Sequence, residues 1–246
     1  MHKNVKFIIL IYQFFLLLPI FSSENIHRKL ANKQYISAIY TGKGELRAVS
    51  RDSWATPLSA YMTSSNITID VSNNYSDVKI TVKDDENENN ITLVFQNDVK
   101  NLVNLFEDLG HIKKVDLSRF KEKPEYISFM FYNCCNLEEV IFGNFDTSNV
   151  KSMYGMFYNT KVTSLDLSRF NTSKVAYMNY MFNNCTQLEY LDLKNFESRC
   201  NSWGMFYGCQ KLKYLNIYSF KDIFNCYNFF PYHWLNTLPS LILIIK

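Results

Sequence analysis

Aspartates at one position of a repeated motif are the residues of this sequence whose spacing could support catalysis. Asp116, Asp166 and Asp192 each stand between two apolar residues, as in the Leu-Asp-Leu triplet at 165–167. Carboxylates on neighbouring strands would lie near the separations of about 5–9.5 Å that glycosidases use for their two acidic groups. The aspartate belongs to the repeated motif itself, however, which favours a structural role. We therefore expect no enzyme activity, and a carbohydrate-active enzyme is the least favoured of three functional hypotheses.

Other catalytic and metal-binding signatures do not occur in the sequence. Its four histidines are scattered, and it has no Gly-x-Ser-x-Gly motif, no His-Glu-x-x-His motif and no phosphate-binding glycine loop. Cysteines are not paired as zinc requires, and the acidic run at 84–88 lacks the glycine and the spacing of a calcium loop. The 26 basic and 23 acidic residues are too evenly balanced for a nucleic-acid partner. We expect no cofactor, no metal and no nucleic acid.

The cysteines leave two alternatives open. Three of the six occupy one position of the repeat, three residues after its phenylalanine: Cys134, Cys185 and Cys209. Stacked repeats would lie about 5 Å apart, so a disulfide between Cys185 and Cys209 is within reach, whereas Cys134 and Cys185 are two repeats apart and too distant. The favoured alternative is that these are small buried thiols that fill a slot of the repeat.

The N-terminal segment predicts export. Residues 1–23 begin with Lys3 and Lys6 and continue as an apolar run to Phe21, which is typical of a secretory signal peptide. An uncleaved signal anchor is the alternative, although a bilayer span needs about 20 apolar residues. We expect a secreted or cell-surface protein whose mature chain contains no membrane span. In a eukaryotic secretory pathway, Asn-x-Ser/Thr sites could carry glycans, and five occur: Asn66, Asn74, Asn90, Asn171 and Asn184.

A repeat of 24–26 residues organises the chain from residue 97 onward. The pair Met-Phe recurs at 130–131, 156–157, 181–182 and 205–206, with Leu105–Phe106 and Phe229–Phe230 in the same frame. The first five pairs are each followed by a line resembling Leu-x-x-Leu-x-Leu and then by another phenylalanine. Self-similarity at this period is typical of units that bury their apolar faces by stacking on one another.

Each unit combines two periods of apolar residues. Before Met-Phe the apolar residues fall at helical spacing, which predicts a short helix that begins at an N-cap: Asp146, Val150, Met153, Met156 and Phe157. After Met-Phe the period is two, which predicts a strand around 165–167. We therefore predict an α/β repeat solenoid of the leucine-rich-repeat type, with one short helix and one short strand per unit and a parallel sheet. It would span 97–246 in about six units, of which the last is incomplete or truncated.

Residues 24–96 are expected to form a small β-rich cap at the N-terminal end of the repeats. Three runs predict strands, at 67–71, 78–82 and 91–95. At the other end, the segment 238–243 repeats the Leu-x-x-Leu-x-Leu spacing and the sequence stops at Lys246. Either the chain is truncated there and lacks further repeats or an anchor, or it presents an apolar strand edge that self-associates. The second alternative is the hypothesis of a structural or assembly protein.

The middle copies resemble the repeats of BspA-like leucine-rich repeat surface proteins, which read approximately FNTSxVxxMxxMFxxCxxLxxLDLS. The residues that carry the resemblance are NFDTSNVKSMYGMFYNTKVTSLDLSRFNTSKVAYMNYMFNNCTQLEYLDLKNF. It covers roughly residues 97–246 and does not extend to 24–96. The resemblance implies an exported or cell-surface protein engaged in adhesion or host interaction. It implies no ligand site, because the shared residues are structural.

The sheet face is the candidate recognition surface, because its side chains would point away from the core. Tyrosines, which supply contact area with a polar tip, gather there on the last two full strands. We name this patch the tyrosine end and predict that it binds the partner: Tyr190, Asp192, Lys194, Tyr214, Asn216 and Tyr218. The alternative is that these tyrosines are incidental in a chain that contains 17 of them. The first hypothesis is thus an exported, non-enzymatic repeat protein that binds a protein or glycan partner.

Overall fold

The computed structural model describes most of the chain from residue 34 onward. The described residues are 34–41, 44–49, 59–62, 67–71, 78–82, 89–95, 99–197, 201–220, 229–230 and 241–245, with the backbone alone for 44–45, 59–62, 67–71, 78–82 and 89. The predicted signal peptide at 1–23 lies outside the described residues.

Six strands precede the repeats: β1 (Gln34–Tyr40), β2 (Gly44–Arg47), β3 (Ser59–Met62), β4 (Ile67–Val71), β5 (Val78–Val82) and β6 (Asn89–Phe95). The strands predicted at 67–71, 78–82 and 91–95 are confirmed as β4, β5 and β6. The run that becomes β1 was not predicted, although its residues alternate between buried and half-buried. β2, β5 and β4 form one antiparallel sheet in that order.

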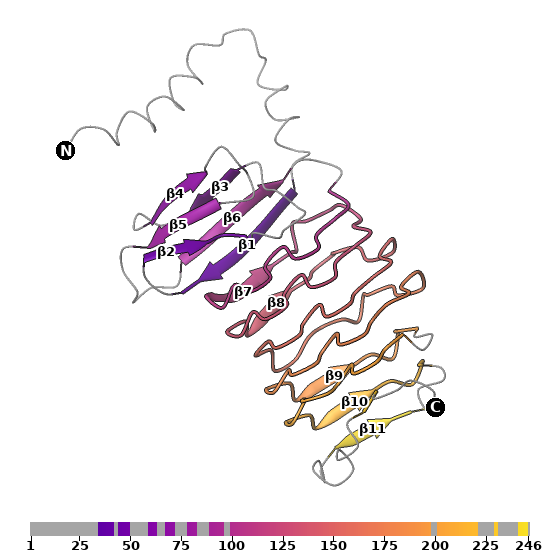
Figure 1. Cartoon of the computed structure of the whole chain (residues 1–246). Coiled ribbons are helices and arrows are strands. Elements are labelled where there is room, and N and C mark those ends of the chain that lie inside the picture. The colour runs from indigo at the N-terminus through magenta and orange to yellow at the C-terminus, as the bar shows by residue number, and fades with distance from the viewer. Residues whose placement is uncertain are drawn as a thin grey trace, which may run out of the picture. The chain divides into compact units, whose positions relative to one another are not determined.

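The repeats contribute five more strands: β7 (Ile112–Asp116), β8 (Glu139–Ile141), β9 (Tyr190–Asp192), β10 (Tyr214–Asn216) and β11 (Ile242–Ile244). β7 pairs with β8 in parallel and with β1 in antiparallel fashion, which gives a sheet in the order β3-β6-β1-β7-β8. β9, β10 and β11 form a separate parallel sheet (Figure 1). The strand β1 therefore covers the edge of the first repeat.

The helices predicted before each Met-Phe pair are not formed, and no helix occurs among the residues that the structure describes. Two kinds of backbone hydrogen bond alternate there instead. Met156 and Tyr158 donate within the repeat to carbonyls three residues back, whereas Gly155 and Phe157 donate to Asn179 and Met181 of the next repeat. A helix would direct all of these bonds to carbonyls four residues back in the same segment. We call this column of stacked turns the turn column.

Two left-handed residues in each repeat make the turn column possible. The residue before the Met-Phe or Leu-Phe pair has a φ of +56° to +61° in five repeats: Asn104, Phe129, Gly155, Tyr180 and Gly204. The residue two positions after the motif phenylalanine has a φ of +55° to +82°: Asp108, Asn133, Asn159, Asn184 and Gly208. Asparagine, aspartate and glycine tolerate this conformation, which interrupts a right-handed helix.

The predicted α/β repeat solenoid of the leucine-rich-repeat type is therefore wrong in two respects. Turns replace the helices, and the strands are divided between small sheets instead of forming one continuous parallel sheet. The division falls at the third repeat, where Ser164 makes only an isolated bridge to Tyr190. No backbone hydrogen bond joins residues 139–142 to residues 164–167, all of which the structure describes.

A bulky side chain accounts for this break in the sheet. Phe142 occupies a position that holds leucine or isoleucine in the other full repeats. Its ring meets the Phe170 ring edge-on, with 4.8 Å between the centroids, and also meets Phe157 at 6.2 Å. Close-packed interiors accommodate extra volume by shifting the chain, so we infer that the phenyl ring at this aliphatic position disfavours strand pairing between the second and third repeats.

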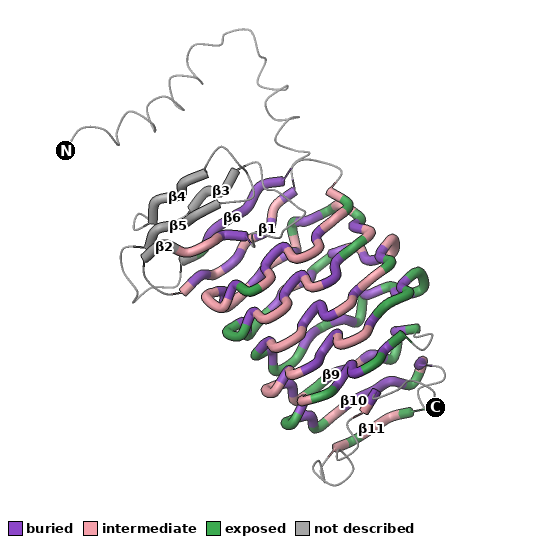
Figure 2. The backbone as a smooth tube through the Cα atoms, viewed as in Figure 1, coloured by how far each residue is buried: buried purple, intermediate pink, exposed green. Residues whose placement is uncertain are grey.

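The core lies between the turn column and the strands (Figure 2). The motif phenylalanines form a continuous stack through it, with centroid separations of 5.4–5.8 Å: Phe106, Phe131, Phe157, Phe182 and Phe206. The leucines that follow them are buried as well, including Leu165 and Leu167. The inward and outward positions predicted for the third repeat are thus correct, although the strand predicted there is not formed.

Candidate functional site

The sheet face of the repeats carries a charged end and the tyrosine end. Lys114 on β7 faces Glu139 on β8, and their charged groups are 2.8 Å apart. At the same position of later repeats, Ser164 faces Tyr190, which in turn faces Tyr214. One row of the face therefore changes from an ion pair through a small residue to two aromatic rings.

The two tyrosines of this row stack on each other at the protein surface. The rings of Tyr190 and Tyr214 are 4.4 Å apart between centroids and nearly parallel, at 8°. Tyr190 is 47% exposed and Tyr218 is 50% exposed. Exposed aromatic surface of this kind is enriched at protein interfaces. The structure thus brings the predicted tyrosines to one surface, and their binding role stays a prediction.

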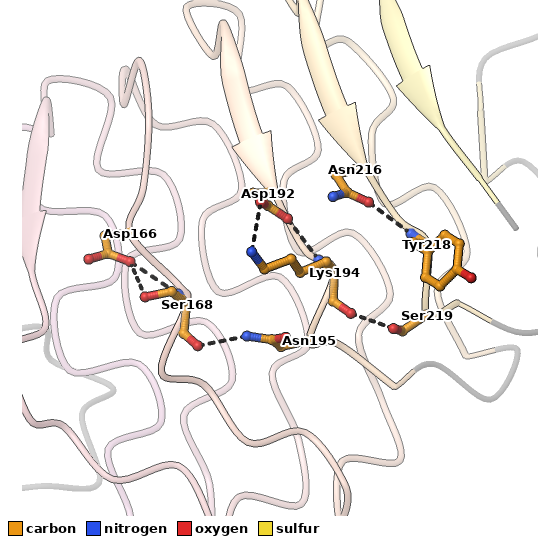
Figure 3. A network of polar contacts seen from close by, with 8 residues as sticks. All are labelled: Asp166, Ser168, Asp192, Lys194, Asn195, Asn216, Tyr218 and Ser219. Carbon is orange, nitrogen blue, oxygen red and sulfur yellow. Dashed lines mark hydrogen bonds and ion pairs between the residues drawn. The ribbon is translucent and has the colours of Figure 1, made fainter.

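The polar members of the tyrosine end mainly support turns (Figure 3). The Asp192 carboxylate accepts a hydrogen bond from the Lys194 amide at 3.0 Å and lies 3.9 Å from the Lys194 ammonium. Asn216 accepts a bond from the Tyr218 amide at 3.1 Å and is buried. Little of Asn216 is therefore accessible to a partner, whereas Asp192 and Lys194 are more exposed, and the contact role of all three stays a prediction.

The repeated aspartates also stabilise turns, as expected from their place in the motif. The carboxylates of Asp116 and Asp166 accept bonds from the amides two residues ahead, at 2.8 and 3.1 Å. The Ser168 hydroxyl, at 2.6 Å, and the Ser168 amide lower the pKa of Asp166 below its usual value. A carboxylate whose pKa is lowered, such as that of Asp166, is poorly suited to donate a proton as a general acid.

Two cavities flank Asp166 on the sheet face. One, of about 350 Å³, is lined by Ser164, Asp166, Tyr190, Asp192 and Lys194, among others. The other, of about 390 Å³, lies on the side of β8 and includes Asp166, Asn144 and Arg169. Both cavities lie beside the third repeat, where the predicted strand is not formed. The surface is therefore concave at the place where the sheet is interrupted.

The described cysteines are free thiols. Cys185 and Cys209 are buried, and their thiols donate to the carbonyls of Phe157 and Phe182 in the preceding repeats, at 2.9 and 3.0 Å. Burial raises the pKa of the Cys185 thiol to about 11. The structure therefore favours the slot-filling thiols over the disulfide between Cys185 and Cys209.

The glycosylation candidates differ in how free their amides are. Asn66 and Asn74 lie outside the described residues. Asn90 and Asn171 are exposed. Asn184, in contrast, has a left-handed backbone, and its side-chain amide donates to Asn159 at 2.8 Å. A glycan on Asn184 would take the place of one of the two hydrogens on this nitrogen, beside the bond to Asn159.

A ladder of asparagine amides runs along the turn column and was not predicted. Asn133 donates to Asp108 at 2.8 Å, Asn159 donates to Asn133, and Asn184 donates to Asn159. All four residues are at one left-handed position of the repeat. The signal was present in the sequence, because asparagine or aspartate stands two residues after the motif phenylalanine in four successive repeats.

Aromatic residues also line the turn column and were not predicted as a group. Successive rings lie 4.9–5.5 Å apart between centroids along the series Phe129, Tyr154, Tyr180 and Trp203. Within this series each ring packs on its neighbour. Tyr177, on the same column, is 52% exposed.

The described part of the chain contains a single histidine, which has a structural contact. The Nε2 atom of this residue, His111, lies 2.6 Å from the Arg47 carbonyl. No group of three or more His, Cys, Asp or Glu residues is arranged to hold a metal ion among the described residues. Nor does any helix in this part of the chain have the length and apolar character to span a membrane.

Comparison with known proteins places the repeats in a family. No curated protein and no solved structure matches the chain. A family model described as “Mycoplasma protein of unknown function, DUF285” matches residues 97–220, just over half of the 246 residues. The matched segment contains the turn column from Asn104 to Gly208 and the tyrosine end. The chain therefore belongs to the DUF285 family.

Proposed function

We propose that this chain is an exported or cell-surface repeat protein that binds a protein or glycan partner through the tyrosine end. The observation that carries the proposal is the stack of the exposed Tyr190 on the half-buried Tyr214, with the exposed Tyr218 close by on the chain. Two rings that are already stacked lose little conformational entropy on binding, and such rigid aromatic groups are common binding hot spots.

Support for export comes from the sequence. The basic and apolar segment at 1–23 is typical of a signal peptide, and the repeats resemble those of BspA-like surface proteins. Protease treatment of intact producing cells tests this part of the proposal. A surface protein would be cleaved while the cells stay closed, whereas complete protection together with an uncleaved N-terminus would contradict export.

Binding is tested with the full chain on intact epithelial cells, by flow cytometry. The double variant Tyr190→Ala/Tyr214→Ala is expected to bind at least tenfold more weakly, because hot-spot aromatics each contribute about 2 kcal/mol or more. The matched control is Tyr177→Ala, which removes an equally exposed tyrosine from the turn column. Equal losses in both variants, or no binding by the unchanged protein, would contradict the proposal.

A second candidate is self-association through β11. This strand pairs with β10 on one side only within its sheet, and Ile242 on it is 60% exposed. Apolar strand edges promote association between chains. Sedimentation at micromolar concentration tests it: a dimer that Ile242→Lys converts to a monomer would favour assembly, and a monomeric unchanged protein would exclude it.

A further inference from the structure

We infer that the partner of the tyrosine end is a neutral glycan, one sugar residue of which occupies the cavity between Tyr190 and the third repeat. The inference rests on the proposed function and adds the chemical class of the ligand. We call this space, lined by Ser164, Asp166, Tyr190, Asp192 and Lys194 and about 350 Å³ in volume, the sugar cavity.

One wall of the sugar cavity is an aromatic face with no ring upon it. Tyr190 stands between two residues of its row, Tyr214 on one side and Ser164 on the other. The Tyr214 ring covers one face of Tyr190 at 4.4 Å, whereas the serine is too small to cover the other. The apolar C–H face of a pyranose ring fits such a flat surface, because the face of an aromatic ring carries partial negative charge.

The rim of the cavity offers oxygen acceptors to a ligand with many hydroxyl groups. Asp166 uses Oδ1 for the turn at Ser168, and its Oδ2 receives no hydrogen bond from the described residues. Asp192 likewise uses Oδ1 for the Lys194 amide at 3.0 Å, and its Oδ2 lies 3.9 Å from the Lys194 ammonium. A carboxylate accepts hydrogen bonds in two directions, so one aspartate can serve two hydroxyl groups of a sugar.

The charges around the cavity favour a neutral ligand over an ionic one. Two carboxylates, Asp166 and Asp192, line the cavity together with one cation, Lys194, and Arg169 lies near Asp166 outside the lining. The lining therefore offers no attraction to an anion, and the two nearby cations offset its carboxylates against a cation. Hydroxyl groups, which both donate and accept, suit a rim that contains carboxylates, an ammonium and the amide group of Asn195.

The adjoining cavity suggests a chain of sugars. Asp166 lines both cavities, and the second extends over Asn144 and Arg169 toward β8. An oligosaccharide could therefore run across Asp166 along the break in the sheet. This arrangement depends on the separation of the repeats at Phe142, which keeps residues 139–142 from bonding to residues 164–167 in this described part of the chain.

The cavity can be filled without removing any contact residue. Ser164→Tyr would place a third ring next to Tyr190 and extend the tyrosine stack into the cavity. We expect the full-chain protein to bind neutral oligosaccharides on an array, and Ser164→Tyr to bind them at least tenfold more weakly. Thr163→Tyr adds the same ring at the neighbouring exposed position, which is not part of the cavity lining; it is the matched control and should bind as the unchanged protein does. Thermal unfolding of each variant checks that it is folded.

A second variant keeps the test decisive if Ser164→Tyr fails to fold. Asp166→Asn retains an oxygen acceptor for the Ser168 turn and removes the carboxylate, so weaker array binding is expected from a folded protein. No binding to neutral oligosaccharides by the unchanged protein, binding to acidic oligosaccharides alone, or undiminished binding by folded variants would overturn the inference.

The cell assay separates this inference from the proposed function. Periodate, which destroys sugars that carry vicinal hydroxyl groups, should abolish binding to cells. If Tyr190→Ala/Tyr214→Ala abolishes cell binding but periodate and Ser164→Tyr do not, the partner is a protein: the proposed function stands and the glycan inference is wrong. If the unchanged protein binds neither cells nor oligosaccharides, both are wrong.

Discussion

At the scale of single residues, the asparagines of the turn column have two tasks. Each adopts a left-handed backbone that few residues tolerate, and the side-chain amide of each donates a hydrogen bond to the corresponding residue of the preceding repeat. Glycine could satisfy the backbone but not the bond, which explains why asparagine recurs here. Gly208 breaks the series, and there a Cβ atom would lie 3.0 Å from the Cα atom of Asn184.

Replacing Asn159 separates the two tasks. Asn159→Ala should lower the free energy of unfolding by about 2–3 kcal/mol, since it loses the ladder bonds and forces alanine into a left-handed conformation. Asn159→Gly loses only the bonds and should be about 1 kcal/mol less destabilised than the alanine variant. Urea denaturation measures both. Equal stability of the two variants would show that the backbone conformation has no cost here.

Asp146 supplies a pH dependence of stability. Hydrogen bonds from the side chain and amide of Ser148, with the Lys123 ammonium at 3.0 Å, lower the pKa of Asp146 to about 2. Because the folded pKa lies below the ordinary value of 3.8, this stabilisation is complete above pH 4 and is lost as the pH falls through the folded pKa. The group is partly exposed, so the effect is small.

The test is a comparison of urea midpoints for the unchanged protein and Asp146→Asn. Their difference should be constant above pH 4 and shrink between pH 4 and 2, as the unchanged protein loses the ionised carboxylate. Lys123→Gln serves as the control that removes the ion pair while leaving the Ser148 turn. A difference that stays constant down to pH 2 would contradict the proposed cause.

At the scale of elements, the turn column shows why the helices were predicted wrongly. Val150, Met153, Met156 and Phe157 are all buried, as the spacing predicts. A chain of three-residue turns, however, also brings every third residue to one side, so the apolar pattern cannot separate turns from a helix. The distinguishing signal is the left-handed position at Asn159, which the apolar pattern does not include.

Glycine and aromatic residues alternate along this column for a steric reason. A Cβ atom on Gly155 would lie 2.9 Å from the ring of Phe129, and one on Gly204 would lie 2.8 Å from the ring of Tyr180. An aromatic residue at the left-handed position of one repeat therefore requires glycine at the same position of the next. The rule explains the order Phe129, Gly155, Tyr180 and Gly204 at this position of four successive repeats.

The rule predicts a measurable coupling. Gly155→Ala should lower the free energy of unfolding by about 2–3 kcal/mol, because its Cβ atom meets the Phe129 ring and its φ is positive. In a double-mutant cycle with Phe129→Ala, the double variant should be more stable than the sum of the single effects by about 1 kcal/mol. If the two changes in the free energy of unfolding were strictly additive, the Phe129 ring would not be the reason that position 155 requires glycine.

At the scale of the whole molecule, the repeat register was predictable and the division into sheets was not. The pairings Lys114 with Glu139 and Tyr190 with Tyr214 follow directly from the spacing of the repeats. The break depends on one oversized residue, Phe142, whose effect is seen only when its neighbours Phe157 and Phe170 are packed around it.

The positions of the candidate site's residues were predictable from the sequence, but the burial of these residues and the shape of the surface were not. The tyrosines could be placed on one surface from the register alone, whereas the burial of Asn216 depends on the turn that follows its strand. The sugar cavity could not be predicted, because it exists where a predicted strand is missing.

The direction of the bonds between repeats has a mechanical consequence. Because residues such as Gly155 and Phe157 each donate forward to the next repeat, these bonds lie along the stack and bear tension when its ends are pulled apart. Under force the repeats should detach one after another, each releasing about 80–90 Å of chain for its 24–26 residues. Single-molecule stretching would record a series of small, evenly spaced drops in force. A cell-surface protein built in this way would lengthen stepwise under shear and keep its partner attached while it yields.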